Sequence, residues 1–413
     1  MIFASNSHPR PARRRFALLA TLVLLLAFAA LCTRAAQSAA EVSGAPGGTA
    51  TPSGFESQGI WVWYVSKSNR GNVAQIIERA KRSRVGTVYI KAGDATTTWS
   101  QFTSSLVDAL HAGGLKVCAW QFVYGNAPYK EAGVGAASVA KGADCLIIDA
   151  EGQYEGKYAS ADRYMRKLRS QIGADFPVAL AAFPYVDYHP GFPYSVFLGP
   201  GGAQFNQPQM YWKTIGTSVR NVYAHTYLYN RIYSRPIYPI GQTYEAPKKR
   251  ELKRFRRFAL SYGAGGVSWW SWQETTGREW GTLGKKVGRI AGFQPSTALP
   301  LLKKGSRGDM VVWAQEHLLG AGQSTLPVTG IFGAQTYNAV VAFQQQSGLY
   351  ADGQIGTDTW VALLRSTPVP VQWGARATTS TARSIAARPG GASAPLSAGI
   401  PAVRDELGSG QAR

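Results

Sequence analysis

Between residues 59 and 292 the chain alternates short, β-rich apolar runs with segments of helical periodicity. Eight such runs occur, at residues 59–65, 86–92, 115–123, 144–151, 177–185, 206–212, 236–244 and 265–272. Intervening segments such as 72–84, 98–112 and 159–172 carry apolar side chains every three or four positions. Eight alternations in about 230 residues predict an α/β fold of the (β/α)8 barrel type. An open doubly wound sheet would also alternate, but no glycine-rich phosphate loop follows the first run.

The carboxyl ends of the strands hold the active site in barrels of this type. Polar and aromatic residues are frequent at the predicted strand ends. Those expected to bind substrate are Lys91, Asp94, Gln121, Gln209, Trp212, Gln242, Trp269, Trp270 and Trp272. Aromatic rings stack on the apolar faces of sugars, while polar neighbours bind the sugar hydroxyls. The mouth of the barrel is therefore interpreted as a carbohydrate site.

The fourth run ends in the stretch CLIIDAEGQYEG, residues 145–156. Its two acids, Asp149 and Glu151, lie on the same side of an extended backbone because side chains alternate with period two. Paired carboxylates suit glycoside hydrolysis, in which one group is held protonated as the general acid. Acidic residues also end many strands that have no catalytic function, so the pair alone identifies no activity.

Residues 301–364 contain an internal repeat, in which TGIFGAQTYNAV at 329–340 returns as DGQIGTDTWVAL at 352–363. Each copy places glycines in a tight turn and then a threonine, Thr336 or Thr359, in the first turn of a helix. A third helix is expected at 309–319. The segment 299–365 closely resembles the all-α, three-helix peptidoglycan-binding domain of bacterial wall hydrolases, which implies binding to wall peptide stems. Thr329 replaces the family's usual aspartate, and a weaker turn bond is expected there.

Three barrel segments, LIIDAE, PQMYW and GGVSWWSW, resemble strand ends of chitinase-type and lysozyme-type glycosidases. The resemblance implies Glu151 as the acid, Asp149 as its partner and Tyr211 as the residue that contacts an acetamide group. It also implies that Trp269, Trp270 or Trp272 forms the floor of a sugar subsite. The longer acidic run of the chitinase type and the first-strand aspartate of the lysozyme type are both missing. The alternative is a barrel that binds glycan without cleaving it.

The two ends of the chain differ in composition from the rest. Arginines precede an apolar run at 16–31, which is shorter than the roughly 20 residues of a membrane span. Residues 1–40 are therefore predicted to be a signal peptide. Residues 41–58 and 366–413 are interpreted as a flexible linker and a disordered tail. The protein is predicted to be secreted and associated with the cell wall, with no stable membrane anchor after cleavage.

The remaining features concern charge, cysteines and histidines. The net charge of +21 favours polyanionic partners, and export makes anionic wall polymers nearer partners than nucleic acid, which is not expected. Part of that charge lies in KKRELKRFRRF, residues 248–258, interpreted as a surface helix with a solvated basic face. Cys118 and Cys145 form either a disulfide or two buried thiols. No histidine shows metal-ligand spacing, so neither a metal nor a cofactor is expected and a metal-dependent amidase is disfavoured.

Overall fold

The centre of the protein is a barrel of parallel strands, seen in a computed structural model that describes residues 53–373. The expected signal peptide, the first part of the linker and most of the tail lie outside the described residues. The strands of the barrel are β1 (Gln58–Val62), β2 (Thr87–Asp94), β4 (Lys116–Val123), β5 (Cys145–Ala150), β6 (Val178–Ala182), β7 (Phe205–Pro208), β8 (Ile240–Gln242) and β9 (Val267–Trp270). A short strand, β3 (Thr97–Thr98), pairs with β2 in the antiparallel direction.

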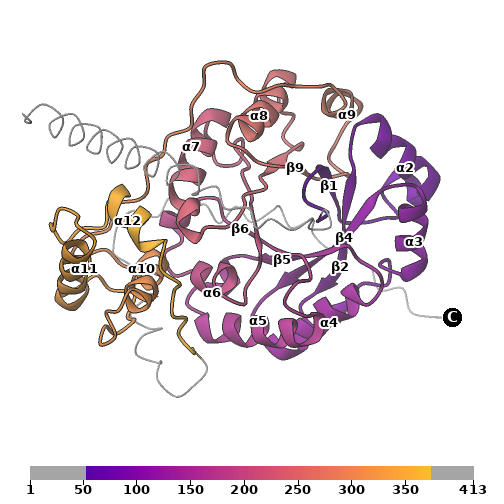
Figure 1. The fold of residues 1–413 in the computed structure, drawn as a ribbon. Helices are drawn as coiled ribbons and strands as arrows, with labels where there is room; N and C mark the ends of the chain where they lie inside the picture. Colours follow the sequence, from indigo (N-terminus) through magenta and orange to yellow (C-terminus); the bar gives the residue numbers. More distant parts are fainter. Residues whose placement is uncertain (1–52, 374–413) are drawn as a thin grey trace, which may run out of the picture. The chain divides into compact units, whose positions relative to one another are not determined.

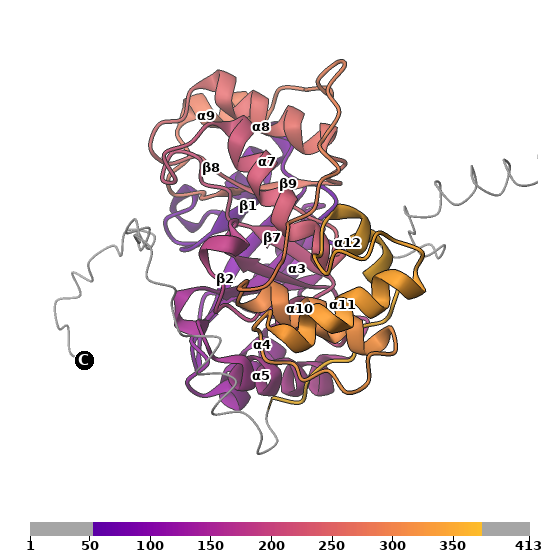
Figure 2. The ribbon, with the colours of Figure 1, turned by 90° about the vertical axis from the view of Figure 1, so that its left-hand side faces the viewer.

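The strand order is β7-β6-β5-β4-β2-β1-β9-β8. The two ends of this path meet through single parallel bridges, Asn206 with Ile237 and Gln209 with Ile240, so the barrel is nearly closed. Helices surround the strands on the outside (Figures 1 and 2). The prediction of a (β/α)8 barrel is confirmed.

Helices follow the strands in the order that the hydrophobic periodicity predicts. Those of the barrel are α2 (Val73–Arg82), α3 (Ser104–Ala112), α4 (Pro128–Val139), α5 (Tyr158–Ile172), α6 (Tyr194–Leu198), α7 (Val219–Asn230), α8 (Lys249–Ser261) and α9 (Gly277–Leu283). Single 3-10 turns are η1 (Asn69–Gly71), η2 (Gly152–Tyr154), η3 (Val186–Tyr188) and η4 (Arg231–Tyr233). No helix in residues 53–373 has both the length and the apolar character that a membrane crossing requires.

Alternation along each strand separates two layers of side chains. Trp61, Tyr89, Trp120 and Ile147 belong to a cluster inside the barrel. Their neighbours in sequence, such as Ile60 and the other apolar residues between strands and helices, belong to a larger outer layer. Whether a strand-end residue can reach the mouth therefore depends on which layer its side chain enters.

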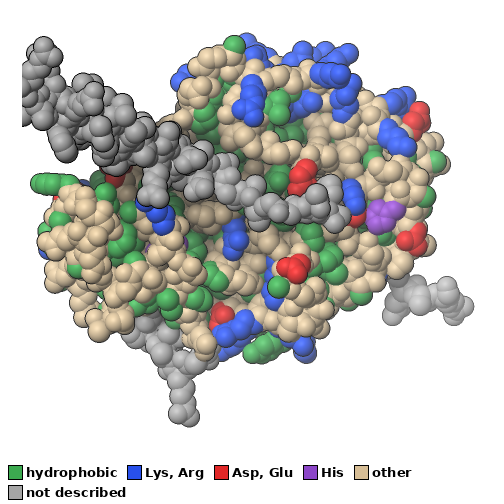
Figure 3. Space-filling model, in the orientation of Figure 1, with side chains coloured by type: hydrophobic (Ala, Val, Ile, Leu, Met, Phe, Trp, Pro, Cys, Tyr) green, Lys and Arg blue, Asp and Glu red, His purple; other side chains and the backbone are tan. Residues whose placement is uncertain are grey.

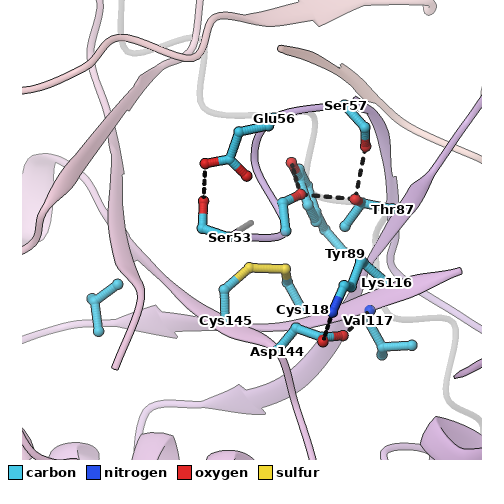
Figure 4. The surroundings of a disulfide bond; sticks show 12 residues. Ser53, Glu56, Ser57, Thr87, Tyr89, Lys116, Val117, Cys118, Asp144 and Cys145 are labelled. Carbon is cyan, nitrogen blue, oxygen red and sulfur yellow. Dashed lines mark hydrogen bonds and ion pairs between the residues drawn. A yellow bond between two sulfur atoms is a disulfide. The ribbon is translucent and has the colours of Figure 1, made fainter. Parts of the chain in front are cut away.

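The amino end of the barrel interior is closed by residues that precede β1 (Figure 4). Phe55 is fully buried there, and its ring lies 4.9 Å from that of Phe205. Cys118 and Cys145 form a disulfide between β4 and β5, so the structure decides the alternative that the sequence left open. The expectation of a flexible linker up to residue 58 is wrong for residues 53–58, because burial of Phe55 holds this segment against the barrel.

The C-terminal module consists of α10 (Asp309–Gly320), α11 (Ala334–Gln346) and α12 (Thr357–Leu363). In each half of the repeat a buried glutamine holds the turn: Gln315 donates to the Thr336 hydroxyl at 2.9 Å and Gln344 to that of Thr359 at 3.1 Å. The Asp352 carboxylate accepts from a backbone N–H at 2.9 Å, whereas the Thr329 hydroxyl accepts the equivalent bond at 3.2 Å. The longer bond agrees with the expected weakening.

Helix α10 also bonds to the barrel. The buried Asp309 carboxylate accepts hydrogen bonds from the Ser195 backbone N–H and hydroxyl and from the Tyr233 hydroxyl. The expected tail, residues 366–413, begins within the described chain, and there the expectation of disorder is wrong. Trp373 is buried and packs on Tyr158 with ring centroids 4.5 Å apart.

Candidate active site

Two carboxylates and one amide form the centre of the candidate site. Asp149 points into the barrel from β5 and is 1 % exposed, whereas Glu151 lies just beyond the strand and is partly exposed. Gln209, directly after β7, donates from Nε2 to Asp149 Oδ1 and to Glu151 Oε1, each at 3.0 Å. One amide group therefore holds both carboxylates, which the sequence predicted to lie on the same side of the strand.

Both acids are held in conditions that disfavour their charged forms. Burial raises the pKa of Asp149 well above its ordinary value, and the neighbouring Glu151 raises it further. Burial also raises the pKa of Glu151, while the hydrogen bond from Gln209 and the nearby His189 oppose that rise. Two close carboxylates in a buried site favour the retention of a proton. The pair can therefore supply a carboxylic acid at a pH where exposed carboxyl groups are ionised.

A buried lysine provides the positive charge beside the pair. Lys91 on β2 is 2 % exposed, and its Nζ lies 2.6 Å from Asp94 Oδ2. The same ammonium group lies 4.6 Å from the ring centroids of Trp63 and Trp99 and 4.8 Å from that of Trp120. This charge lowers the pKa of Asp149 against the effect of burial. Lys91 and Asp94 thus lie near the acids, as the sequence predicts.

Aromatic rings fill the interior next to the acids. Trp270 lies 5.5 to 5.6 Å from Trp61, Trp63 and Trp120, measured between ring centroids. Tyr211 is 7 % exposed, and within residues 53–373 its hydroxyl has no hydrogen-bond partner. Burial raises the pKa of Tyr211 well above its ordinary value, and Asp149 and Glu151 add to that rise. The hydroxyl therefore remains a proton donor close to both carboxylates.

Two other predicted tryptophans do not reach the mouth. Trp269 belongs to the outer layer and packs on Phe255 at 5.3 Å, because it alternates with the inward-facing Trp270. Trp272 lies beyond the end of β9 and packs on Trp280 of α9 at 4.7 Å. Of the three candidates for a sugar floor, only Trp270 lies inside the barrel.

Trp212 and Gln121 are also placed between strands and helices. The Trp212 ring packs on Phe255 at 5.2 Å. Gln121 is fully buried, and its amide donates to the backbone carbonyls of Ala95 and Glu131. The prediction that these two side chains line the mouth is wrong, because both point to the outer layer.

Gln242 has a supporting position at the end of β8. Its Oε1 accepts from the Lys213 backbone N–H at 2.7 Å, and its Nε2 donates to Glu245 Oε2 at 3.2 Å. The side chain therefore joins the loops after β7 and β8.

Several site residues were missed by the sequence analysis. Trp63, Trp99 and Trp120 surround the Lys91 ammonium group. Trp120 could have been found from its spacing, because it lies two residues from Cys118 on the same face of β4. No signal in the sequence marks Trp99, which follows the short β3. Within the described range, no group of three or more His, Cys, Asp or Glu side chains is arranged to hold a metal ion.

Comparisons with known proteins separate the two parts of the chain. Residues 307–363 match the family described as "Putative peptidoglycan binding domain". A peptidoglycan-binding protein from Clostridioides difficile is 44% identical over an overlap that covers 17% of this chain and 43% of that chain, with a TM-score of 0.16. The predicted C-terminal peptidoglycan-binding domain is thus confirmed.

The barrel overlaps solved glycosidase structures at low identity. The spore cortex-lytic enzyme SleL of Bacillus cereus is 10% identical over 57% of this chain and 75% of that chain, with a TM-score of 0.41. A chitinase domain from Pyrococcus furiosus is 12% identical over 57% of this chain and 95% of that chain, with a TM-score of 0.42.

Proposed function

We propose that the protein is a secreted glycoside hydrolase that cleaves the N-acetylated glycan chains of peptidoglycan. The observation that carries this proposal is the Gln209 amide that bridges Asp149 and Glu151 at 3.0 Å each, among aromatic rings inside the barrel. A pair of neighbouring acids with raised pKa values, one buried and one partly exposed, suits general acid catalysis of glycoside cleavage. The C-terminal domain supports peptidoglycan as the polymer.

Glu151 is the proposed general acid because it is the more exposed member of the pair. In its protonated form it gives a proton to the glycosidic oxygen as the bond to the anomeric carbon breaks. The acetamide oxygen of the same sugar forms the new bond to that carbon. Water then attacks the carbon and returns a proton to the Glu151 carboxylate, which restores the acetamide and leaves a new reducing end. This route requires no second catalytic carboxylate on the opposite side of the sugar.

Asp149 and Tyr211 are the proposed ligands of the acetamide group. The Asp149 carboxylate can accept the acetamide N–H, which orients the carbonyl oxygen toward the anomeric carbon. The Tyr211 hydroxyl is available to donate to that oxygen, since it makes no hydrogen bond within the described chain. Trp270 is 5 % exposed and packs on Trp63 at 5.6 Å, so the partly exposed Trp63 ring offers the aromatic surface to a sugar.

The module that contains α10, α11 and α12 is proposed to attach the protein to the cell wall. Residues 1–40 are proposed to act as a signal peptide that directs export. A module bound to wall peptides would keep the barrel at a high local concentration of glycan chains. The proposed role of the C-terminal module is therefore to increase cleavage of insoluble sacculi more than cleavage of short soluble fragments.

The test is Glu151→Gln, assayed by release of reducing ends from purified sacculi. We expect a loss of about 1,000-fold, since general acids commonly contribute factors of this order. The matched control is Glu78→Gln on α2, because the Glu78 side chain is 60% exposed on the outer surface and makes only a surface ion pair. The control should retain full activity. Equal, low release by wild type and Glu151→Gln would instead support a barrel that binds glycan without cleaving it.

A further inference from the structure

The molecule carries a strongly basic surface that the proposed hydrolase chemistry does not use. We name it the basic face and define it as the lysines and arginines of residues 81–84, 253–257 and 285–289. These three ranges contain ten cationic residues and no acid. Figure 3 shows Lys and Arg side chains gathered along the upper edge of the molecule, over α8.

Helix α8 supplies the centre of the basic face. Its buried side, which includes Leu252, Phe255 and Phe258, packs into the barrel's outer layer, as the sequence predicts. Lys253, Arg254 and Arg257 are exposed on the other side. The Lys253 and Arg254 side chains have no ion-pair or hydrogen-bond partner within residues 53–373. Their charges are therefore available to a ligand.

Tertiary structure joins the three ranges into one surface. Arg256 donates from Nη1 to the Lys285 carbonyl at 2.6 Å, and Arg84 donates from Nε to the Gly284 carbonyl at 3.0 Å. Arg257 donates to the Arg289 carbonyl at 3.4 Å. Each guanidinium group carries five N–H donors, so these bonds leave others for a ligand. These bonds hold several positively charged side chains close together, where they repel one another.

A hollow at the edge of the basic face is suited to one anionic group. It has a volume of about 410 Å³ and lies between α2 and α9, with Arg79, Arg82, Lys285 and backbone of Gly281 and Gly284 in its lining. Arg82 also forms an exposed ion pair with Glu78 at 3.2 Å. The Nε of Arg79 is buried and has no hydrogen-bond partner within the described residues. A buried, unpartnered guanidinium donor in a cationic hollow indicates a site for an oxyanion.

The basic face lies away from the mouth of the barrel. Arg84 lies three residues before the start of β2, and residues 285–289 follow the carboxyl end of α9. Helices of a (β/α)8 barrel run back from the carboxyl end of the strands to their amino end, so both segments lie near the amino end. A polymer bound at the basic face would leave the candidate active site open.

We propose that the basic face binds a linear polyanion of the phosphodiester type, such as a wall-linked phosphate polymer, with one phosphate in the hollow. Charge complementarity to repeated phosphates supports this ligand. The aromatic residues under the face, Phe255, Phe258 and Trp280, are at most 5 % exposed and cannot stack on bases. Single-stranded nucleic acids depend on such stacking, so a polymer without bases is the better fit. The proposal does not depend on catalysis by the barrel.

The test compares two triple variants of equal net charge. The first reverses three charges of the basic face: Lys253→Glu/Arg254→Glu/Lys286→Glu. The second reverses three charges on α4 and α5: Lys130→Glu/Arg163→Glu/Lys167→Glu. Binding of the purified protein to inorganic polyphosphate is measured at two salt concentrations. The first triple should weaken binding about 30-fold and lower its salt dependence, and the second less than about threefold, because charges beyond a Debye length of about 8 Å are screened.

Two results would overturn the proposal. Equal weakening by both triples would show that only net charge attracts the polymer. Tighter binding of a thymidine oligonucleotide of equal charge, lost in the first triple, would assign the face to nucleic acid. Lys253→Gln/Arg254→Gln/Lys286→Gln guards against a folding defect and should give an intermediate loss. Lys285→Gln tests the hollow alone, with about a threefold loss expected for one partly exposed ion pair.

Discussion

Asp144 and Asp149 lie at opposite ends of β5 and have opposite electrostatic surroundings. Asp144, at the amino end, accepts from Lys116 Nζ at 2.7 Å, His111 Nε2 at 2.7 Å and the Val117 backbone N–H at 2.8 Å. Burial alone would raise its pKa, but these three donors lower it below its ordinary value. Asp149, at the carboxyl end, has one amide donor and an acidic neighbour, and its pKa is raised.

The two ends of β5 therefore differ in role: the amino end contributes to stability, and the carboxyl end holds the candidate active site. At the amino end, the charged carboxylate is compensated and lies beside the Cys118–Cys145 disulfide (Figure 4). At the carboxyl end, burial and few donors raise the pKa values of the acids, which costs folding free energy; in the proposed function these acids provide protons for catalysis. This division agrees with the general pattern of (β/α)8 barrels, in which the amino end stabilises and the carboxyl end reacts.

The largest expected effect on stability comes from the amino end. Replacing both disulfide cysteines by alanine, Cys118→Ala/Cys145→Ala, should lower the free energy of unfolding by about 3.5 kcal/mol, since the bond closes a loop with a sequence separation of 27 residues. Urea unfolding of the wild type and the variant measures this loss. Cleavage of sacculi per folded molecule should not change. If this variant folded normally but lost activity, the claim that the amino end affects only stability would be wrong.

The second effect concerns the carboxyl end. Asp149→Asn should reduce sacculus cleavage about 100-fold, because the acetamide loses an anionic acceptor. Its free energy of unfolding at neutral pH should be no lower than that of the wild type. The reason is that a raised pKa makes the charged form unfavourable in the folded state, so the carboxylate destabilises the protein above its ordinary pKa. A clear loss of stability would contradict the proposed role.

The third effect is the counterpart at the amino end. Asp144→Asn should lower the free energy of unfolding by about 2 kcal/mol at neutral pH, because the Lys116 and His111 side chains lose a charged acceptor. The lowered pKa of Asp144 means that its stabilisation is present above the ordinary value of 3.8 and is lost as pH falls through the folded-state pKa. Acid unfolding curves should therefore converge for wild type and variant at low pH, with glycan cleavage unaffected at neutral pH.

The smallest effect concerns Gln209, one of the three glutamines predicted for the mouth. Gln209→Leu should reduce turnover about tenfold, in line with the loss of one positioned hydrogen-bond donor (about 1.4 kcal/mol). It should also move the alkaline limb of the pH–rate profile to higher pH. The hydrogen bond from Gln209 lowers the pKa of Glu151, so without it the acid keeps its proton to a higher pH.

Gln121→Leu is the matched control for this prediction. The Gln121 amide bonds two backbone carbonyls in the outer layer, so its loss should reduce stability and leave the pH–rate profile in place. If Gln121→Leu moved the profile as Gln209→Leu does, the assignment of these two side chains to different layers would be wrong.

Much of this arrangement was predictable because it depends on local periodicity. Eight apolar runs separated by helical segments led to the barrel, and period two led to the shared side of Asp149 and Glu151. The same alternation places Gln121 and Trp269 outside the barrel once one neighbour on the strand is known to point inward. Alternation alone does not say which side chains point inward, so the sequence did not separate Trp269 from Trp270.

The sequence by itself thus determined the barrel, the peptidoglycan-binding domain and the acidic pair, because each depends on residues close together in the chain. Only the tertiary structure brought Gln209 to that pair across 60 residues, and it alone joined three basic segments into one face. It also decided which aspartate of β5 has its pKa lowered by nearby donors and which has its pKa raised by burial. Burial and the number of donors set a carboxyl group's pKa, and both are properties of packing between distant segments.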